Sequence, residues 1–548
     1  MNIVDYRESL MAQGSQHQRT AGFYGWAREH RKLWLWLTFV LVAIAVELPF
    51  LLNNHLFGGW DQQFHVNRIE ELYLSAKNGV WHNAISTYTF RGSGLGIQIF
   101  YPYVFLYPYA ILRLVGLPGI MALYLGNAFY IIASCWISYW CMRVFLKLRA
   151  ARRPISGAWL FAILYNLSGY MVFNETVRFD LPEAQSMMWY PILFLGLYLT
   201  LTEHRRGWLL TTLGATMLVY THVLSALLAA GTVVVVLALG WRYLNRWQTW
   251  LDLVLTAVVT GLLSLPELLG MLGTTKQVTV ASPLIGSLAK QAISPFVAVV
   301  FSIGNVTKTG LLTHGVTLGT IVLLALVALW IGFRHLDRFG KTLAILSTVL
   351  FWMTTKLFPW RFLEHTPINL IQHPWRFYTF ISFFVLVAFV ILVDRMQLRF
   401  NWQGWIVGLS LLLTMVTGFV YAGVSSPKVS ANSYEQFATD ANYFDYAPKR
   451  SVHHLKAIYA HQAVVFEGDE AISHPHVKMI AQPNGMTIQL PKTVSGHRVD
   501  LPVFNYGSQH YVVRTGDAKR LHVSVSERGT VQVYVPSGTK TVQVHYRK

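Results

Sequence analysis

The feature that most constrains this chain is a series of apolar blocks, each about as long as a membrane-crossing helix. A helix needs about 20 residues to cross the roughly 30 Å hydrocarbon core of a bilayer. The blocks lie at 33–52, 119–142, 156–173, 184–202, 208–221, 223–240, 250–270, 317–333, 342–355, 377–393 and 405–423. We therefore predict an α-helical polytopic membrane protein with about eleven transmembrane helices.

The composition agrees with this class and narrows the choice of partners. Hydrophobic residues make up 54% of the 548 residues, and charged residues only 13%. Soluble domains average about 25% charged residues. The net charge of +19 could indicate a nucleic-acid partner, but much of it lies in short segments between apolar blocks. Membrane topology explains that placement, so we expect no nucleic-acid binding.

The distribution of positive charge predicts the orientation in the membrane. With the N-terminus inside, the cytoplasmic pieces hold 19 Lys and Arg in 78 residues, and the outer loops hold 11 in 142. This asymmetry follows the positive-inside rule. The segment 100–117 contains two prolines and an arginine, and counting it as a span would reverse the charge pattern that follows. We interpret it as an interfacial or re-entrant helix.

The last part of the chain changes character. Apolar blocks end before residue 425, and period-2 alternation predicts strands at 522–526, 531–535 and 541–546. We therefore divide the chain into a cytoplasmic tail (1–32), a membrane domain (33–424) with a large first outer loop (54–118), and an extracytoplasmic domain (425–548). The last is expected to be a β-sandwich.

Polar residues gather in the first outer loop, in the sequence GGWDQQFHVNRIEEL. Asp61, His65 and Arg68 are spaced i, i+4 and i+7, so they share one face if this segment is helical. A polar site on the outer face of the membrane would use that spacing. An amphipathic helix lying solvated on the membrane surface explains it equally well.

A second group lies between two closely spaced apolar blocks, in NETVRFDLPEAQ at 174–185. Glu183 begins the second block, and an acid near hydrocarbon usually has a partner. Arg178 is the candidate. His222 lies at the predicted tip of a hairpin between two spans, where a structural role is the simpler interpretation.

A third group, IQHPWRF, precedes a late apolar block. Arg376 follows His373 and Trp375 and could act as a fork that binds phosphate oxygens beside the bilayer. The alternative is an aromatic anchor at the membrane interface with an arginine reaching toward water. No Walker, GxGxxG, HExxH, paired CxxC or nucleophile-elbow motif is present, which argues against a nucleotide-using enzyme.

In order, these elements resemble the membrane family labelled 6-pyruvoyl-tetrahydropterin synthase-related. The similar elements are Asp61, His65 and Arg68 with Phe100-Tyr101-Pro102, then Arg178 with Glu183, Trp375 with Arg376, and LPVFNYGSQHYVV from Leu501. Tyr506-Gly507-Ser508-Gln509 stands where the family commonly has YPGY. The family name is not literal, because nothing in the chain resembles the zinc-binding histidine set of a pterin synthase.

The architecture in turn resembles the GT-C superfamily of polyprenyl-phosphate-sugar glycosyltransferases. The resemblance implies a sugar donor on a polyprenyl-phosphate carrier in the membrane lipid, and an acceptor that is a surface glycan, a glycolipid or a protein. Asp61 would be the general base, and His65 would orient either Asp61 or the acceptor. Arg376, Arg178 and Arg68 would bind the donor phosphate. The expected supporting residues are Glu183, His222, Trp375, His373 and Tyr101.

Two questions stay open at this point. Asp61 and Glu183 could bind a divalent ion, but no spacing requires a metal cofactor. A lipid-carrier transporter, or an assembly partner in envelope polysaccharide synthesis, would use the same arginines without a base. A transporter would place ionisable groups near the bilayer midplane, whereas these lie near the outer helix ends, which favours the enzyme.

Overall fold

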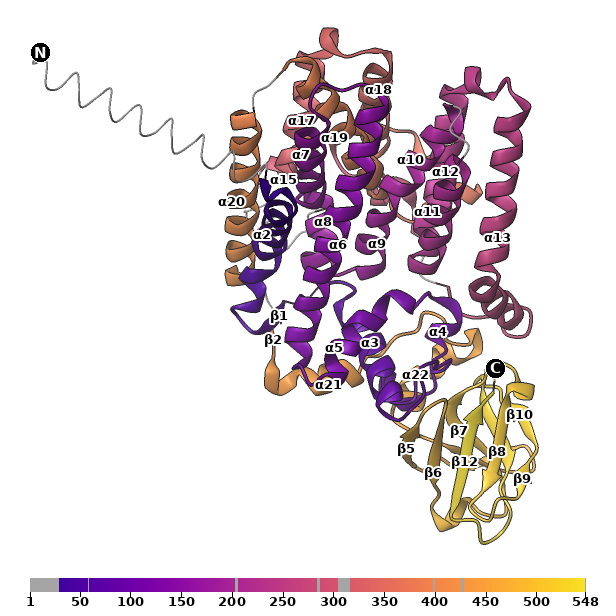
Figure 1. The fold of residues 1–548 in the computed structure, drawn as a ribbon. Helices are drawn as coiled ribbons and strands as arrows, with labels where there is room; N and C mark the ends of the chain where they lie inside the picture. Colours follow the sequence, from indigo (N-terminus) through magenta and orange to yellow (C-terminus); the bar gives the residue numbers. More distant parts are fainter. Residues whose placement is uncertain are drawn as a thin grey trace, which may run out of the picture.

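The computed structural model describes residues 29–57, 59–202, 206–282, 286–303, 316–397, 400–424 and 428–547. Most of the predicted tail 1–32 lies outside these residues. The described chain forms a helical bundle with a β domain at one end, and short helices lie between the two (Figure 1). The predicted combination of a polytopic helical domain and a C-terminal β domain is confirmed.

Each predicted apolar block coincides with a helix of the bundle. The long helices are α2 (Arg31–Leu51), α6 (Gly119–Leu148), α7 (Pro154–Asn166), α10 (Tyr190–Leu201), α11 (Gly207–Thr221), α12 (Val223–Leu239), α13 (Trp247–Thr275), α17 (Thr320–Ile331), α18 (Arg338–Met353), α19 (Tyr378–Arg395) and α20 (Phe400–Val424). Shorter ones are α8 (Gly169–Val172), α9 (Leu181–Ser186), α14 (Leu288–Gln291) and α15 (Pro295–Ile303). Among the described residues, six helices are long and apolar enough to cross a membrane. The chain is a multi-pass membrane protein.

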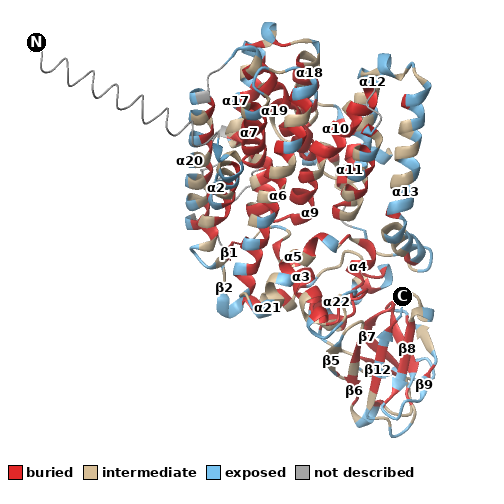
Figure 2. Ribbon diagram, viewed as in Figure 1, coloured by how far each residue is buried: buried red, intermediate tan, exposed pale blue. Residues whose placement is uncertain are grey.

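The bundle exposes apolar side chains where a soluble protein would bury them. Figure 2 shows α13 largely exposed and α19 buried. On α13, Leu262, Leu263 and Leu269 are each at least 50% exposed, and most of this helix is apolar. Exposed apolar surface of this kind marks a contact with a membrane or with another protein, and a membrane-spanning helix places it against lipid. α19 is also apolar on all sides, and it forms the centre of the bundle because its neighbours cover it.

The predicted first outer loop lies across one end of the bundle. It contains β1 (His55–Phe57), α3 (Gln62–Lys77), α4 (Ile97–Phe100) and α5 (Tyr107–Leu114) (Figure 1). α5 has 8 residues and is therefore about 12 Å long, less than half the thickness of the hydrocarbon core. α5 alone is too short to cross the membrane, and the interpretation of segment 100–117 as an interfacial or re-entrant helix stays a prediction.

The β domain consists of two antiparallel sheets of five strands each. One has the order β10-β11-β7-β3-β4 and the other β5-β6-β12-β8-β9. The strands are β3 (Val464–Glu467), β4 (Glu470–Ser473), β5 (Lys478–Gln482), β6 (Gly485–Gln489), β7 (Arg498–Phe504), β8 (Tyr511–Thr515), β9 (Arg520–Leu521), β10 (Val523–Val525), β11 (Thr530–Tyr534) and β12 (Thr541–Tyr546). Val499, Val531 and Val544 belong to its buried core, as alternation along the strands requires. The predicted strands at 522–526, 531–535 and 541–546 correspond to β10, β11 and β12.

The segment before the sheets belongs structurally to the first outer loop. It contains β2 (Lys428–Ser430), α21 (Tyr434–Thr439) and α22 (Leu455–Tyr459), and β2 pairs with β1. The buried Tyr506 of the β domain accepts a hydrogen bond from the Gly96 N–H (3.0 Å) and donates to the Tyr446 carbonyl (2.9 Å). This one tyrosine ties the β domain to the loop that carries Asp61.

Candidate functional site

Asp61 stands immediately before α3, and its side chain turns away from that helix. The carboxylate caps none of the described N–H groups of α3. Its Oδ2 instead lies 3.4 Å from Nε of Arg178, and its backbone N–H donates to the Arg178 carbonyl (3.0 Å). The side chain remains 37% exposed. Asp61 is thus held in place through its backbone and Arg178, and only part of its side chain stays accessible.

The predicted helix through His65 and Arg68 is confirmed, but the two side chains have different surroundings. Both are buried, and Arg68 Nη1 lies 3.4 Å from His65 Nδ1. Arg68 Nη2 donates to the carbonyls of Tyr101 (3.2 Å) and Pro102 (2.5 Å), and its guanidinium lies over the Tyr101 ring. Arg68 therefore holds the Tyr101-Pro102 turn rather than facing a ligand.

Arg178 is surrounded by carboxylates. Its Nη2 lies 2.6 Å from Asp180 Oδ2 and its Nη1 2.7 Å from Glu183 Oε2, in addition to the Asp61 contact. Nη1 also donates to Asn174 Oδ1 (3.1 Å). The predicted pairing of Arg178 with Glu183 is confirmed. A guanidinium has five N–H donors, and this buried one already uses donors on all three nitrogens.

Glu183 connects Arg178 to Arg376. Its Oε2 accepts from both, at 3.1 Å from Arg376 Nε, and its Oε1 accepts from the Tyr170 hydroxyl. Arg376 Nη1 donates to the Ile371 carbonyl (3.1 Å) and to Gln372 Oε1 (2.8 Å). In the described chain, Arg376 Nη2 has no hydrogen-bond partner. Arg376 is therefore fixed in position, and its Nη2 remains available to donate a hydrogen bond to a ligand.

Asp61, Arg178, Asp180 and Arg376 line a cavity at the end of the bundle that faces the β domain. Its polar lining is Asp61, His65, Arg178, Asp180, His222, Gln372, Arg376 and Asp445. Its apolar and aromatic lining is Phe64, Phe100, Tyr101, Pro102, Val223, Leu224, Leu227, Met271, Leu370, Tyr443 and Tyr446. The lining includes every predicted site residue except Arg68, Glu183, Trp375 and His373. The lining is amphipathic, because it combines charged groups with apolar and aromatic side chains.

Burial sets the protonation of the two groups named for acid–base chemistry. Burial raises the pKa of Asp61 to about 6. The charges of Asp180 and Glu183 add to the rise, and those of Arg178 and Arg376 oppose it. Burial lowers the pKa of His65, and the charge of Arg68 lowers it further. At pH 7 Asp61 is ionised and more basic than an ordinary aspartate, and His65 is neutral. This is a tuning suited to a general base.

The aromatic and histidine residues predicted to support the site pack around it. Trp375 is only 3% exposed, stacks on His373 (ring centroids 4.6 Å apart), and lies under the Arg178 guanidinium (4.9 Å). Trp375 and Arg376 are therefore not an interfacial anchor, because neither reaches the lipid surface. His222 stacks on Tyr101 and bonds Ser225 Oγ through Nδ1 (2.8 Å).

Three further residues reach the site from segments that the sequence did not single out. Tyr443, Asp445 and Tyr446 line the cavity from the segment that precedes the β domain. Burial raises the pKa of Asp445 to about 6. The only signal in the sequence was the cluster of aromatic and acidic residues in NYFDY. Asp180 also lines the cavity and pairs with Arg178. In the sequence it is one of several charges beside a predicted span, where a charge often only marks the end of a helix.

The candidate metal ligands are already engaged with an arginine. Within the described ranges, no group of three or more His, Cys, Asp or Glu side chains could hold a metal ion. Asp61 and Glu183 both contact Arg178.

The chain was compared with known proteins. No family model and no curated protein matches it. Among solved structures it is similar to the arabinofuranosyltransferase AftD from Mycobacteria, with 16% identity and a TM-score of 0.43 over 72% of this chain and 27% of that one. It is also similar to ArnT from Cupriavidus metallidurans bound to undecaprenyl phosphate (12% identity, TM-score 0.42, 76% of each chain). A third similar structure is the oligosaccharyltransferase AglB from Archaeoglobus fulgidus, with 13% identity and a TM-score of 0.39 over 79% of this chain and 58% of that one.

These similarities are distant. The chain spans about a quarter of the length of AftD. At such identities and TM-scores the likeness concerns overall arrangement, so the chemistry must be inferred from the residues of the site. The resemblance to the 6-pyruvoyl-tetrahydropterin synthase-related family stays a prediction.

Proposed function

We propose that this chain is an inverting GT-C-type glycosyltransferase that moves a sugar from a polyprenyl-phosphate carrier to an acceptor hydroxyl on the outer face of a cell membrane. The observation that carries the proposal is a single cavity that joins the Asp61 carboxylate, the Arg376 guanidinium and an apolar wall. A lipid-phosphate sugar needs all three: a base beside its reacting carbon, a cation at its phosphate and an apolar surface along its lipid chain.

The donor would lie with its phosphate at Arg376 and its chain along α12. Nη2 of Arg376 supplies a charge-assisted hydrogen bond to a phosphate oxygen, and Glu183 and Gln372 keep the guanidinium in place. Leu227 of α12 and Leu370 line the cavity and are about half-exposed (50% and 47%). They extend the apolar wall toward the bilayer, where a polyprenyl chain would continue.

Asp61 would act as the general base. It takes the proton of the acceptor hydroxyl while the acceptor oxygen bonds to the anomeric carbon of the sugar. The bond between that carbon and the phosphate oxygen breaks, and its electron pair leaves with the carrier phosphate. Negative charge grows on the phosphate as the bond breaks, so Arg376 stabilises the transition state more than the bound donor.

Two of the arginines predicted to bind phosphate are assigned other roles. Arg178 would be a positioning residue, because its contacts with Asp61, Asp180 and Glu183 leave it little capacity for a ligand. Arg68 would fix the Tyr101-Pro102 wall. His65 would help to position the acceptor. Its Nε2 lies 3.8 Å from Oδ1 of Asp180, and both residues line the cavity.

The acceptor would enter from the side of the β domain. A second cavity of about 550 Å³ shares Tyr443 with the first and is also lined by Arg91, Lys456 and Tyr459. Arg91 lies in a run of left-handed residues, with φ of 50° at Phe90, 53° at Arg91 and 64° at Gly92. Strained backbone of this kind gathers at ligand sites. The tyrosine rings would stack on sugar rings of a glycan, glycolipid or glycosylated protein acceptor.

The variant Asp61→Asn tests the proposal. It keeps the size of the side chain and removes the base, which typically costs about 100- to 10,000-fold in rate. Membranes from a deletion strain that carries each variant would be given polyprenyl-phosphate sugars extracted from the parent strain. Product would be measured by mass spectrometry of surface polymers. Asp469→Asn, at an exposed carboxylate of the β domain, is the matched control.

Stability distinguishes lost chemistry from lost folding. Because the pKa of Asp61 is raised in the folded state, ionisation of Asp61 costs stability as pH rises through about 6. Asp61→Asn should therefore be at least as stable as the parent at pH 7. A stable Asp61→Asn protein with undiminished product would support a transporter or assembly role instead.

A further inference from the structure

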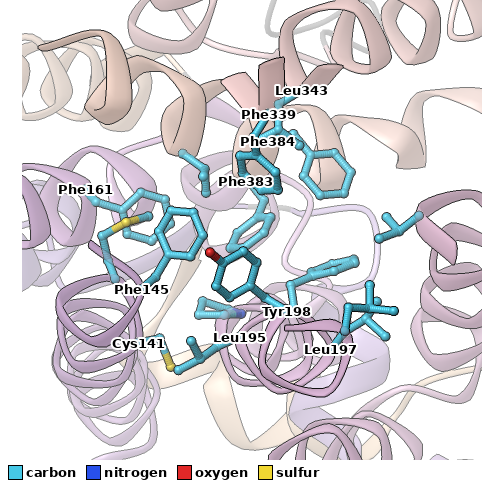
Figure 3. Close-up of a pocket in the computed structure, with 16 residues that line it drawn as sticks. Cys141, Phe145, Phe161, Leu195, Leu197, Tyr198, Phe339, Leu343, Phe383 and Phe384 are labelled. Carbon is cyan, nitrogen blue, oxygen red and sulfur yellow. The ribbon is translucent and has the colours of Figure 1, made fainter. Parts of the chain in front are cut away.

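A separate apolar cavity lies inside the bundle, away from the Asp61 site. It lies among α6, α7, α10, α12, α18 and α19. Figure 3 shows the rings of Phe145, Phe161, Phe383 and Tyr198 gathered around it. Apolar side chains make up nearly all of its lining, so only a hydrocarbon-like occupant suits it. Phe339, Tyr198 and Val236 of this lining are only half-buried.

A polar cavity of about 610 Å³ lies at the end of the same helices, on the side of the bundle opposite the β domain. It is lined by Arg149, Arg152, Asp337, Asp394 and Arg395 together with a few small or aliphatic side chains. The two cavities draw on successive turns of α6 and α19, through the neighbours Phe145 and Leu146 on α6 and Val387 and Ile391 on α19.

Arg149 joins the two cavities. Its guanidinium carbon lies 5.4 Å from the centre of the Phe145 ring and 4.7 Å from that of Phe339, and both rings line the apolar cavity. The same guanidinium lines the polar cavity and forms an ion pair with Asp337. A ligand with a charged head and an apolar tail would contact Arg149 where head and tail meet.

The carboxylates of the polar cavity are used by the protein itself. Asp337 accepts from Arg149, from Arg395 Nη2 (3.2 Å) and from the Gly340 N–H at the start of α18 (2.9 Å). Asp394 accepts from the backbone N–H groups of Arg152 (3.2 Å) and Arg153 (3.0 Å). The cavity thus holds three guanidinium groups and two carboxylates that already accept hydrogen bonds from the protein. Its net positive charge favours an anionic ligand.

We propose that these two cavities form a binding site for an anionic glycerophospholipid. Its phosphate lies among Arg149, Arg152 and Arg395, and one acyl chain enters the apolar cavity past Phe339. Basic pockets between transmembrane helices bind anionic headgroups in this way. With the predicted orientation the lipid belongs to the cytoplasmic leaflet. An acidic soluble protein would match the arginines but would leave the apolar cavity empty. The proposal is independent of glycosyl transfer.

The test uses purified full-length protein in detergent with dioleoyl phosphatidylglycerol as the probe. Phosphatidylglycerol should raise the melting temperature and stay bound in native mass spectrometry, whereas dioleoyl phosphatidylcholine should do neither. The double variant Arg152→Gln, Arg395→Gln should bind phosphatidylglycerol about 30-fold more weakly, from about 1 kcal/mol per arginine near a membrane surface. Arg334→Gln with Arg338→Gln, at the same end of the bundle but outside the cavity, is the matched control.

A second measurement locates the acyl chain. Phosphatidylglycerol with a photoreactive acyl chain should label peptides from α6, α18 or α19 that line the apolar cavity. Equal effects of the two lipids, or equal loss in both double variants, would overturn the proposal by showing that no specific headgroup site exists. Labelling confined to other helices would also overturn it. So would a melting shift with undecaprenyl phosphate but none with phosphatidylglycerol, because the occupant would then be the carrier.

Discussion

The two ends of the bundle each contain an arginine packed on an aromatic ring and paired with acidic side chains, but the two clusters differ in burial and in charge balance. At the end facing the β domain, Arg178 lies over Trp375 and contacts three carboxylates, and its side chain is 5% exposed. At the other end, Arg149 lies over Phe339 and is paired with Asp337, and these side chains are 18% and 22% exposed.

The difference shows what each arginine can do. Arg178 has its donors committed to carboxylates, which is why we propose a positioning role for Arg178 and ligand binding for Arg376. Arg149 shares its single carboxylate with Arg395 and borders two cavities, so it can add a ligand without breaking its own contacts. Burial alone does not separate the two roles, because Arg376 is as buried as Arg178. We infer that an arginine whose donors are all paired positions a site, and that one with a donor left over can bind a ligand there.

The first prediction decides which cluster faces outward, and its outcome is all or none. A cysteine replacing Thr493 in the β domain should react with a membrane-impermeant maleimide in intact cells, and one replacing His335 should react only after lysis. Both positions are exposed, and the native Cys135 and Cys141 are buried, so background labelling should be low. Labelling of the His335 position in intact cells would place Asp61 on the cytoplasmic side.

The second prediction concerns stability. Arg178→Ala leaves Asp61 and Asp180 without their cation and leaves Glu183 with Arg376 alone. It should cost about 3–5 kcal/mol of unfolding free energy. Arg149→Ala removes a partly exposed pair and should cost about 1 kcal/mol or less. SDS-induced unfolding in mixed micelles, followed by tryptophan fluorescence, measures both. Similar losses in the two variants would remove the distinction between the clusters.

The third prediction separates Arg376 from Arg178. Arg376→Ala should lower product formation about 10- to 150-fold, which corresponds to the 1.5–3 kcal/mol of a hydrogen bond to a charged group. Arg376→Lys should recover only part of it, because lysine lacks the planar fork. The membrane assay with extracted polyprenyl-phosphate sugars measures the loss. Full activity of Arg376→Lys would show that only the charge is needed.

The fourth prediction concerns how product formation depends on pH, and the expected change near neutral pH is smaller than the losses predicted above. Asp61 has a pKa of about 6 and must be ionised to accept a proton. Product formation should therefore fall about tenfold per pH unit below pH 6 and level off above pH 7. The stability contribution of Asp61 has the opposite sign, since protonation below pH 6 favours the folded state. Activity that is flat between pH 5 and 8 would exclude Asp61 as the titrating base.

Much of the architecture could be predicted from the sequence, because it depends on neighbouring residues. Apolar blocks near 20 residues long specify helices in lipid, since no other open structure satisfies its backbone hydrogen bonds there. Alternating residues specify the strands near the C-terminus. The pairing of Arg178 with Glu183 was also predictable, because five residues of chain hold them close together.

The composition of the site was decided by tertiary structure. Arg376 meets Glu183 across 193 positions of the chain, and Tyr443 joins Phe64 with ring centroids 4.8 Å apart from a segment nearly four hundred residues later. No local pattern distinguishes an arginine that binds a ligand from one that is already paired. That distinction depends on how many carboxylates the packed helices bring within hydrogen-bond distance of each guanidinium, and packing is a property of the whole bundle.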